Sequence, residues 1–95
     1  MPKTDTRASV SVRVSGRVQG VGFRYFVMEK AQAAGIKGWV RNCPNGEVEA
    51  EGAGTRQALE VWIDLLRKGP TMSRVDSVAA EWKPANRAYA TFEIR

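Results

Sequence analysis

The sequence predicts an α+β fold in which two helices cover one face of a mostly antiparallel sheet. Three observations lead to this prediction. Apolar and polar residues alternate in some segments, apolar residues recur at helical spacing in two others, and glycine or proline stands at most junctions. The 95 residues suffice for one domain with a single hydrophobic core. We expect residues 1–8 to form a polar N-terminal tail and residues 9–95 to form the domain.

The first strand and the first helix are predicted by two different periods. Val10, Val12 and Val14 alternate with polar residues, which is the period of a strand with one buried face. Over residues 23–34, apolar side chains recur at helical spacing, and Gly35 follows as a C-terminal cap. A strand and a helix are therefore expected in succession, joined by a glycine-rich loop.

The middle of the chain predicts a hairpin followed by an amphipathic helix. Two β-type runs, residues 37–42 and 47–52, flank the turn signal Pro44-Asn45-Gly46. Thr55 can cap a second helix that Gly69-Pro70 ends. Its apolar stripe falls at i, i+3, i+4 and i+7 and consists of Leu59, Trp62, Ile63 and Leu66.

Two further strands complete the predicted sheet. The fourth runs from about Val75 through Trp82, and a short last strand spans residues 89–95. The order strand, helix, strand, strand, helix, strand is that of the ferredoxin-like split β-α-β arrangement. Because the first helix joins two parallel strands, their C-terminal ends lie at the same edge of the sheet. Asn42, which closes the second strand, can therefore face the glycine loop that follows the first.

The loop between the first strand and the first helix has the features of an anion site. It consists of Gly16, Arg17, Val18, Gln19, Gly20, Val21 and Gly22. Glycines allow successive backbone N–H groups to turn inward, and the following helix directs the positive end of its dipole at the same point. Arg24 adds a planar fork of donors that suits phosphate oxygens. We therefore predict a phosphate-binding loop.

The absence of histidine restricts the chemistry of this site. The chain contains none, so it lacks the side chain most often used for proton transfer near neutral pH. Hydrolysis of an acyl phosphate needs no general acid, because the parent acid of the leaving carboxylate has a pKa of about 4. Arg24 and the loop amides would hold the phosphoryl group, and the Asn42 amide would orient water for in-line attack. A phosphate oxygen of the substrate would accept the proton of that water.

Two segments resemble the signature segments of the acylphosphatase family. They are GRVQGVGFR at residues 16–24 and GWVRN at residues 38–42, the latter followed by PNGEVE. The resemblance extends to the segment around residues 69–78 and to the FEIR ending. It implies a cofactor-independent hydrolase that splits carboxyl phosphates into carboxylate and inorganic phosphate. It also implies that Arg24 binds phosphate, that Asn42 positions water and that residues 16–22 form the phosphate cradle.

Two other classes of function remain open on the sequence. The net charge of +5 indicates an anionic partner, either a polynucleotide or a small phosphorylated molecule. An RNA-binding module shares this order of elements, but the third strand, EVEAEG, presents carboxylates and no aromatic ring. A non-catalytic binder of small anions would use the same loop without turnover. We expect a small acyl phosphate and inorganic phosphate as partners, without nucleic acid or membrane.

The remaining reactive side chains are expected to have structural roles. Cys43, the one cysteine, is interpreted as a small packed residue, because a thiolate phosphatase would need an arginine where Glu49 stands. Glu47, Glu49 and Glu51 alternate and are expected on the solvent face of their strand. No metal or cofactor is predicted. A monomer in the cytoplasm is expected, since the polar start of the chain lacks the apolar segment of a secretory signal.

Overall fold

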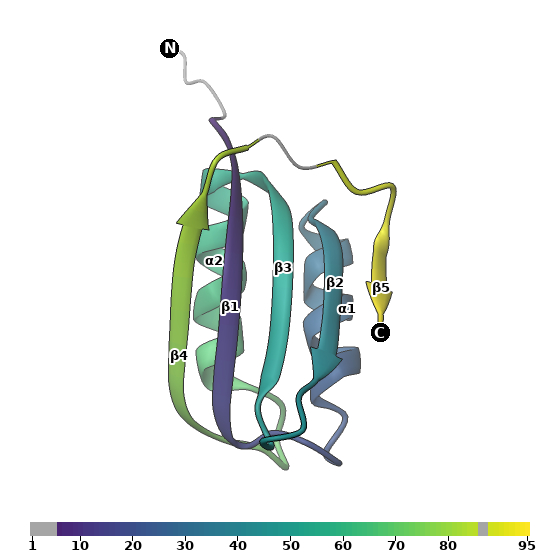
Figure 1. Ribbon diagram of the computed structural model, residues 1–95, viewed down its shortest axis with the longest axis vertical. Helices are drawn as coiled ribbons and strands as arrows, with labels where there is room; N and C mark the ends of the chain where they lie inside the picture. The colour runs from purple at the N-terminus through teal and green to yellow at the C-terminus, as the bar shows by residue number, and fades with distance from the viewer. Residues whose placement is uncertain (1–5, 86–87) are drawn as a thin grey trace.

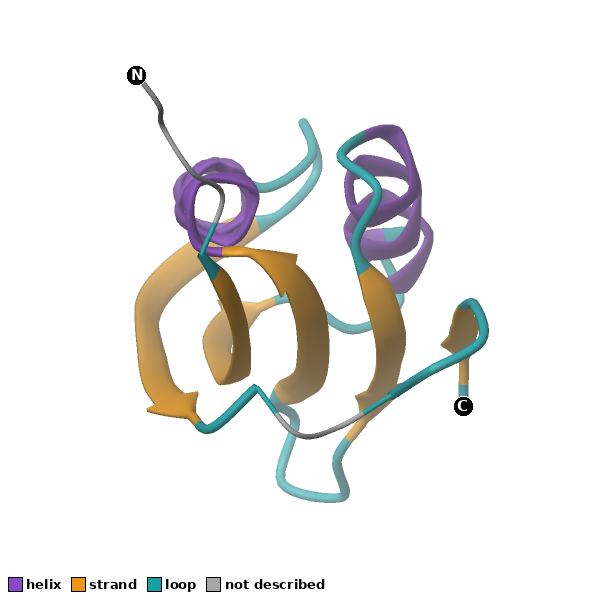
Figure 2. Ribbon diagram, turned by 90° about the horizontal axis from the view of Figure 1, so that it is seen from above, coloured by secondary structure: helices purple, strands orange, loops and turns teal. Residues whose placement is uncertain are grey.

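Two helices lie on one face of a five-stranded sheet in the computed structural model, which describes residues 6–85 and 88–95 (Figures 1 and 2). The strands are β1 (Arg7–Arg17), β2 (Lys37–Asn42), β3 (Val48–Thr55), β4 (Arg74–Lys83) and β5 (Phe92–Ile94), and the helices are α1 (Phe23–Ala33) and α2 (Arg56–Lys68). The sheet order is β4-β1-β3-β2-β5. Only the β2–β5 pair of this described sheet is parallel. The predicted ferredoxin-like α+β fold is confirmed.

The ends of both helices follow from local capping. The Thr55 Oγ1 accepts a hydrogen bond from the Ala58 N–H at 3.1 Å, so the predicted cap of α2 is confirmed. Gly69, with φ 70°, follows the last turn of α2. Helix α1 ends at Ala33, one residue before the predicted end, and Gly35 follows with φ 73°.

Three strands differ in extent from the sequence prediction. β1 begins at Arg7, because Arg7 and Ala8 pair with the end of β3, and β3 itself continues past Gly52 to Thr55. β5 covers only Phe92–Ile94, because its three residues pair with Gly38, Trp39 and Val40 of β2. The sheet therefore extends further at the start of the chain, and less at its end, than the sequence pattern indicates.

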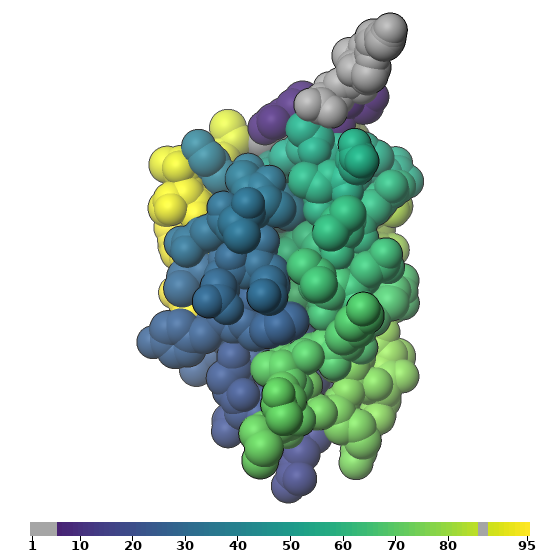
Figure 3. Space-filling model, turned by 180° about the vertical axis from the view of Figure 1, so that it is seen from behind, coloured from purple at the N-terminus to yellow at the C-terminus, as the bar shows by residue number. Residues whose placement is uncertain are grey.

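A hydrophobic core between the sheet and the helix pair fixes both helices in place. Figure 3 shows α1 and α2 side by side on the far face of the sheet. The apolar residues of β1 that alternate in sequence are buried, and so is the predicted stripe of α2; these side chains are Val10, Val12, Val14, Leu59, Trp62, Ile63 and Leu66. The Trp62 Nε1 donates to the Val27 carbonyl oxygen at 3.2 Å, which ties α2 to α1. The two helices are thus held as one layer.

One edge of the sheet gathers three connections. β1 and β2 are both antiparallel to β3, so they run in the same direction and end at the same edge. The β1–α1 loop, the β2–β3 turn and the segment between α2 and β4 all lie at this edge, the lower one in Figure 1. The predicted placement of Asn42 and the glycine loop at a common edge is confirmed.

Candidate active site

The β1–α1 loop follows a β-bulge at Ser15 and Gly16. Gly16 has φ 125°, and a Cβ at this position would lie 2.1 Å from the Arg74 carbonyl oxygen of β4. Gly22, with φ 77°, is the N-cap of α1 and turns the chain into the helix. The Val18 side chain is buried in the core and anchors the loop between these two points. The glycines therefore let the loop pass close to β4 and then enter the helix.

The loop and the first turn of α1 expose a run of backbone donors. Within the described residues, the N–H groups of residues 19–25 make no hydrogen bond, and the first helical bond runs from the Phe26 N–H to the Gly22 carbonyl at 3.0 Å. The first turn of α1 contains no acidic residue and has no side-chain cap. Free N–H groups at a helix start, together with the helix dipole, favour an anion. This part of the site can therefore hold a phosphate-like group.

Arg24 adds a full positive charge beside these donors. It is the second residue of α1 and is half-buried. Its guanidinium makes no hydrogen bond or ion pair with any other residue that the structure describes, unlike the guanidinium of Arg41, which lies 2.7 Å from a Glu49 oxygen. A guanidinium offers five donors in a fixed plane. Arg24 is therefore available for a tetrahedral anion.

Asn42 ends β2 at the same edge of the sheet. Its side chain is half-buried, and its Oδ1 is enclosed without a hydrogen-bond partner among the described residues. A buried acceptor without a partner costs about 1–3 kcal/mol, so such an atom usually marks a place where another donor binds. Asn42 also borders a hollow that Trp39, Arg41, Glu49 and Arg95 line on the face of the sheet opposite the helices.

The Gln19 side chain joins the loop to the end of β2. Its Nε2 donates to the Cys43 carbonyl oxygen at 2.7 Å and to the Glu47 carbonyl oxygen at 2.9 Å. Cys43 directly follows Asn42, so these bonds hold the loop beside the asparagine. From the sequence, Gln19 is expected to act only through its backbone amide, so this role of its side chain was not predicted. The signal that could have revealed it is a long amide side chain in a loop of glycines and valines.

The β2–β3 turn that receives Gln19 is itself well ordered by local bonds. The Asn45 Oδ1 accepts from the Glu47 N–H at 3.0 Å, and the Cys43 N–H donates to the Glu47 carbonyl at 2.8 Å. Cys43 is buried, as its interpretation as a packed residue predicts. The turn therefore presents fixed carbonyl groups to the loop.

The predicted solvent face of β3 is more enclosed than expected. Glu51 is only 9% exposed and accepts hydrogen bonds from the Ser11 and Tyr89 hydroxyls. Glu49 forms ion pairs with Arg13 at 3.4 Å and with Arg41 at 2.7 Å, because both arginines stand opposite it on neighbouring strands. The hydrogen bond to Glu49 raises the pKa of the Arg41 guanidinium above its usual value. The carboxylates lie on the predicted face, but their neighbours cover and neutralise them.

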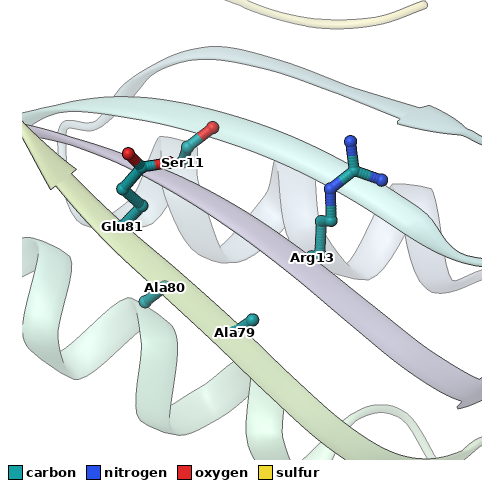
Figure 4. Close-up of a pocket in the computed structure, with 5 residues that line it drawn as sticks. All are labelled: Ser11, Arg13, Ala79, Ala80 and Glu81. Atoms are coloured by element: carbon teal, nitrogen blue, oxygen red, sulfur yellow. The ribbon is translucent and has the colours of Figure 1, made fainter.

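A separate hollow on the β1–β4 part of the sheet stands apart from this site. Ser11, Arg13, Ala79, Ala80 and Glu81 line it, and Figure 4 shows them along the middle of the two strands. None of the loop residues, Arg24 or Asn42 borders this hollow. It therefore does not extend the candidate site.

Neither a metal-binding cluster nor a membrane-spanning helix occurs in the part of the chain that the structure describes. Within residues 6–85 and 88–95, no three His, Cys, Asp or Glu side chains come together in a way that could hold a metal ion. Neither described helix has the length and apolar character needed to cross a bilayer.

The fold and the edge site together define a ferredoxin-like α+β protein that gathers donors for an anion at one edge of its sheet. The chain belongs to the acylphosphatase family, whose model matches residues 10–94. An acylphosphatase of Salinibacter ruber is 42% identical over 93 residues, which cover 98% of each chain. The family and its relatives make this chain an enzyme that hydrolyses acyl phosphates, with a small-molecule acyl phosphate as its substrate.

Solved structures agree with this assignment in fold. An acylphosphatase from Coxiella burnetii superposes with a TM-score of 0.89 at 35% identity, covering 94% of this chain and 93% of the other. The acylphosphatase from Bacillus subtilis superposes with a TM-score of 0.90 at 33% identity, covering 93% of this chain and 98% of the other. The resemblance noted in the two sequence segments is therefore confirmed for the family, the fold and the activity.

Proposed function

We propose that residues 16–22 and Arg24 hold the phosphoryl group of the acyl phosphate, while Asn42 orients the attacking water. Gly16 and Arg17 of this predicted loop belong to the end of β1, because they pair with β4, and residues 18–22 form the β1–α1 loop. The observation that carries this proposal is the run of N–H groups over residues 19–25 that have no hydrogen-bond partner among the described residues. The enclosed Asn42 Oδ1 stands at the same edge, and the Gln19 side chain ties the two parts together. We infer that donors for an anion and an acceptor for water serve one phosphoryl group at this edge of the sheet.

The reaction requires little more than this arrangement. The water oxygen forms a bond to phosphorus while the bond from phosphorus to the acyl oxygen breaks, and the electron pair leaves with the carboxylate. The proton of the water passes to a phosphate oxygen, which gives carboxylate and inorganic phosphate. The loop amides and Arg24 stabilise the negative charge on the phosphoryl oxygens in the transition state. The carboxylate departs without a proton, which agrees with a chain that contains no histidine.

A small-anion binder without turnover would use the same loop. Substitution of Asn42 distinguishes such a binder from a hydrolase. We expect Asn42→Ala to lower kcat on benzoyl phosphate about 10²–10³-fold, the range found when one group that acts on the transition state is removed. Competitive inhibition by inorganic phosphate should persist in this variant, because the loop and Arg24 are intact. Arg24→Ala should weaken both phosphate inhibition and turnover.

The matched control is Arg67→Ala, which removes an exposed arginine of α2 whose nearest carboxylate partner is Asp64 at 3.8 Å. This variant should keep wild-type kinetics. Steady-state rates and phosphate inhibition constants of the purified variants decide the question. Normal turnover by Asn42→Ala would contradict the assigned role of the asparagine, and unchanged phosphate inhibition in Arg24→Ala would contradict that of the arginine.

The protein is further proposed to act as a monomer in the cytoplasm, without metal, cofactor or nucleic acid. The carboxylates of β3 support the last point, because Arg13 and Arg41 pair with them instead of presenting free charge to a polyanion. Light scattering on the purified protein tests the oligomeric state, and fluorescence anisotropy with single-stranded RNA at low salt tests the RNA-binding alternative. A dimer mass, or RNA binding that saturates at micromolar protein, would contradict these proposals.

A further inference from the structure

We propose that the acyl group of the substrate lies in a hollow beside α1, and that this hollow favours apolar acyl groups over negatively charged ones. The inference rests on the proposed function, in which the loop and Arg24 hold the phosphoryl group. The hollow has a volume of about 480 Å³, and its lining includes Gly22, Tyr25, Phe26, Met28, Glu29 and Pro70. This volume falls within the usual range of sites for small molecules, about 300–1,000 Å³.

The hollow begins where the proposed phosphate loop ends. Gly22 is both the last residue of the loop and the N-cap of α1, and it forms one border of the hollow. Pro70, which follows α2, forms the opposite part of the lining. The loop before α1 and the segment after α2 lie side by side at the lower end of the helix face in Figure 3. An acyl group attached to a phosphoryl group at Gly22 can therefore enter this hollow directly.

In-line attack requires the leaving group to point away from the attacking water. Attacking and leaving oxygens stand on opposite sides of phosphorus. Asn42, which is proposed to orient the water, does not border the α1 hollow; it borders the separate hollow that Trp39 and Arg41 line. The α1 hollow therefore offers room for the acyl group apart from the attacking water.

The lining determines which acyl groups fit best. Tyr25 is 69% exposed although it is aromatic, and Phe26 and Met28 are only partly covered by the core. Large exposed apolar side chains beside a site favour an apolar ligand. Glu29 adds a carboxylate that makes no ion pair with another described residue, so it repels a second negative charge. Lys30 lies over the Phe26 ring but does not line the hollow.

The test compares three substrates that share the phosphoryl group and differ in the acyl group. They are benzoyl phosphate, 4-carboxybenzoyl phosphate and acetyl phosphate. We expect kcat/KM to be at least tenfold higher for benzoyl phosphate than for its 4-carboxy analogue. Tyr25→Ala should lower kcat/KM about three- to tenfold for benzoyl phosphate and less for acetyl phosphate, because one face of the benzoyl ring loses its contact with Tyr25. Glu29→Gln should reduce the ratio of kcat/KM for benzoyl phosphate to kcat/KM for 4-carboxybenzoyl phosphate.

The control variant is Val61→Ala, which removes an apolar side chain of α2 that is 53% exposed and does not border the hollow. It should leave the preference among the three substrates unchanged. Equal kcat/KM values for benzoyl and 4-carboxybenzoyl phosphate, or an equal loss for benzoyl and acetyl phosphate in Tyr25→Ala, would overturn the acyl site alone. Failure of the wild-type enzyme to hydrolyse any of the three would overturn the proposed function together with this site.

Discussion

Gln19 couples the two parts of the proposed site through one side chain. Its Nε2 contacts two carbonyl groups of the β2–β3 turn, one of which belongs to the residue after Asn42. No other side chain of the described loop residues makes a hydrogen bond across this junction. The distance between the proposed phosphate donors and the amide proposed to orient water therefore depends on a residue that needs no contact with substrate.

Gln19→Ala should therefore impair catalysis more than folding. Two neutral hydrogen bonds contribute about 1 kcal/mol each, and a loss of about 1.4 kcal/mol in positioning corresponds to a tenfold rate change. We expect kcat on benzoyl phosphate to fall roughly tenfold, while the phosphate inhibition constant changes much less. Gln57→Ala, on the exposed surface of α2, is the matched control. A loss confined to phosphate affinity, with kcat retained, would mean that Gln19 acts on the loop and not on the position of Asn42.

The residues of the candidate site differ in how far the sequence could predict them. The shared edge of Asn42 and the loop follows from topology, since a helix that joins parallel strands brings their ends together. The bonds of the Gln19 side chain join residues 24 and 28 positions apart in the chain, and the enclosure of the Asn42 Oδ1 depends on packing around the end of β2. No local pattern encodes such contacts, so these features appear only in the structure.

Among the elements, β3 shows why a sequence pattern can fail to predict where a strand ends. The strand continues through Gly52 and Gly54 to Thr55, although glycine weakens a strand in general. The reason is helix packing: a Cβ at Gly52 would lie 2.8 Å from a Trp62 ring carbon and 2.9 Å from the Ile36 Cγ2. The missing side chain lets Trp62 of α2 and Ile36, the residue before β2, pack against β3. The alternating carboxylates before Gly52 were predicted, whereas this contact between elements was not.

Gly52→Ala should destabilise the fold without affecting the chemistry. Inserting a methyl group into a packed core costs about 1–3 kcal/mol. Gly54→Ala is the matched control. A Cβ added at Gly54 would lie 3.4 Å from the nearest heavy atom, the Ile36 Cγ1, which is at the limit of ordinary contact. Urea unfolding should give a clearly lower midpoint for Gly52→Ala than for Gly54→Ala, with wild-type kcat in both. Equal midpoints would show that Trp62 and Ile36 can move aside at little cost.

For the molecule as a whole, the proposed chemistry depends on groups that do not titrate near neutral pH. The 95-residue chain has no histidine, and the proposed site consists of backbone amides, the Asn42 carboxamide and the Arg24 guanidinium. Amides carry no titrating proton in this range, and a guanidinium stays protonated. The catalytic machinery should therefore keep one charge state over a wide range of pH.

We expect kcat to vary little between about pH 5 and 8, the range in which an imidazole would titrate. The second ionisation of the substrate's phosphoryl group, which for phosphate esters has a pKa of about 6, can still affect substrate binding. Measuring kcat and kcat/KM across this range for benzoyl and acetyl phosphate distinguishes titration of the substrate from titration of a protein group. A transition in kcat/KM that moves with the acyl group belongs to the substrate. A bell-shaped kcat profile centred near neutrality and identical for both substrates would require a titrating protein group, and the proposed arrangement of amides, Arg24 and Asn42 would then be incomplete.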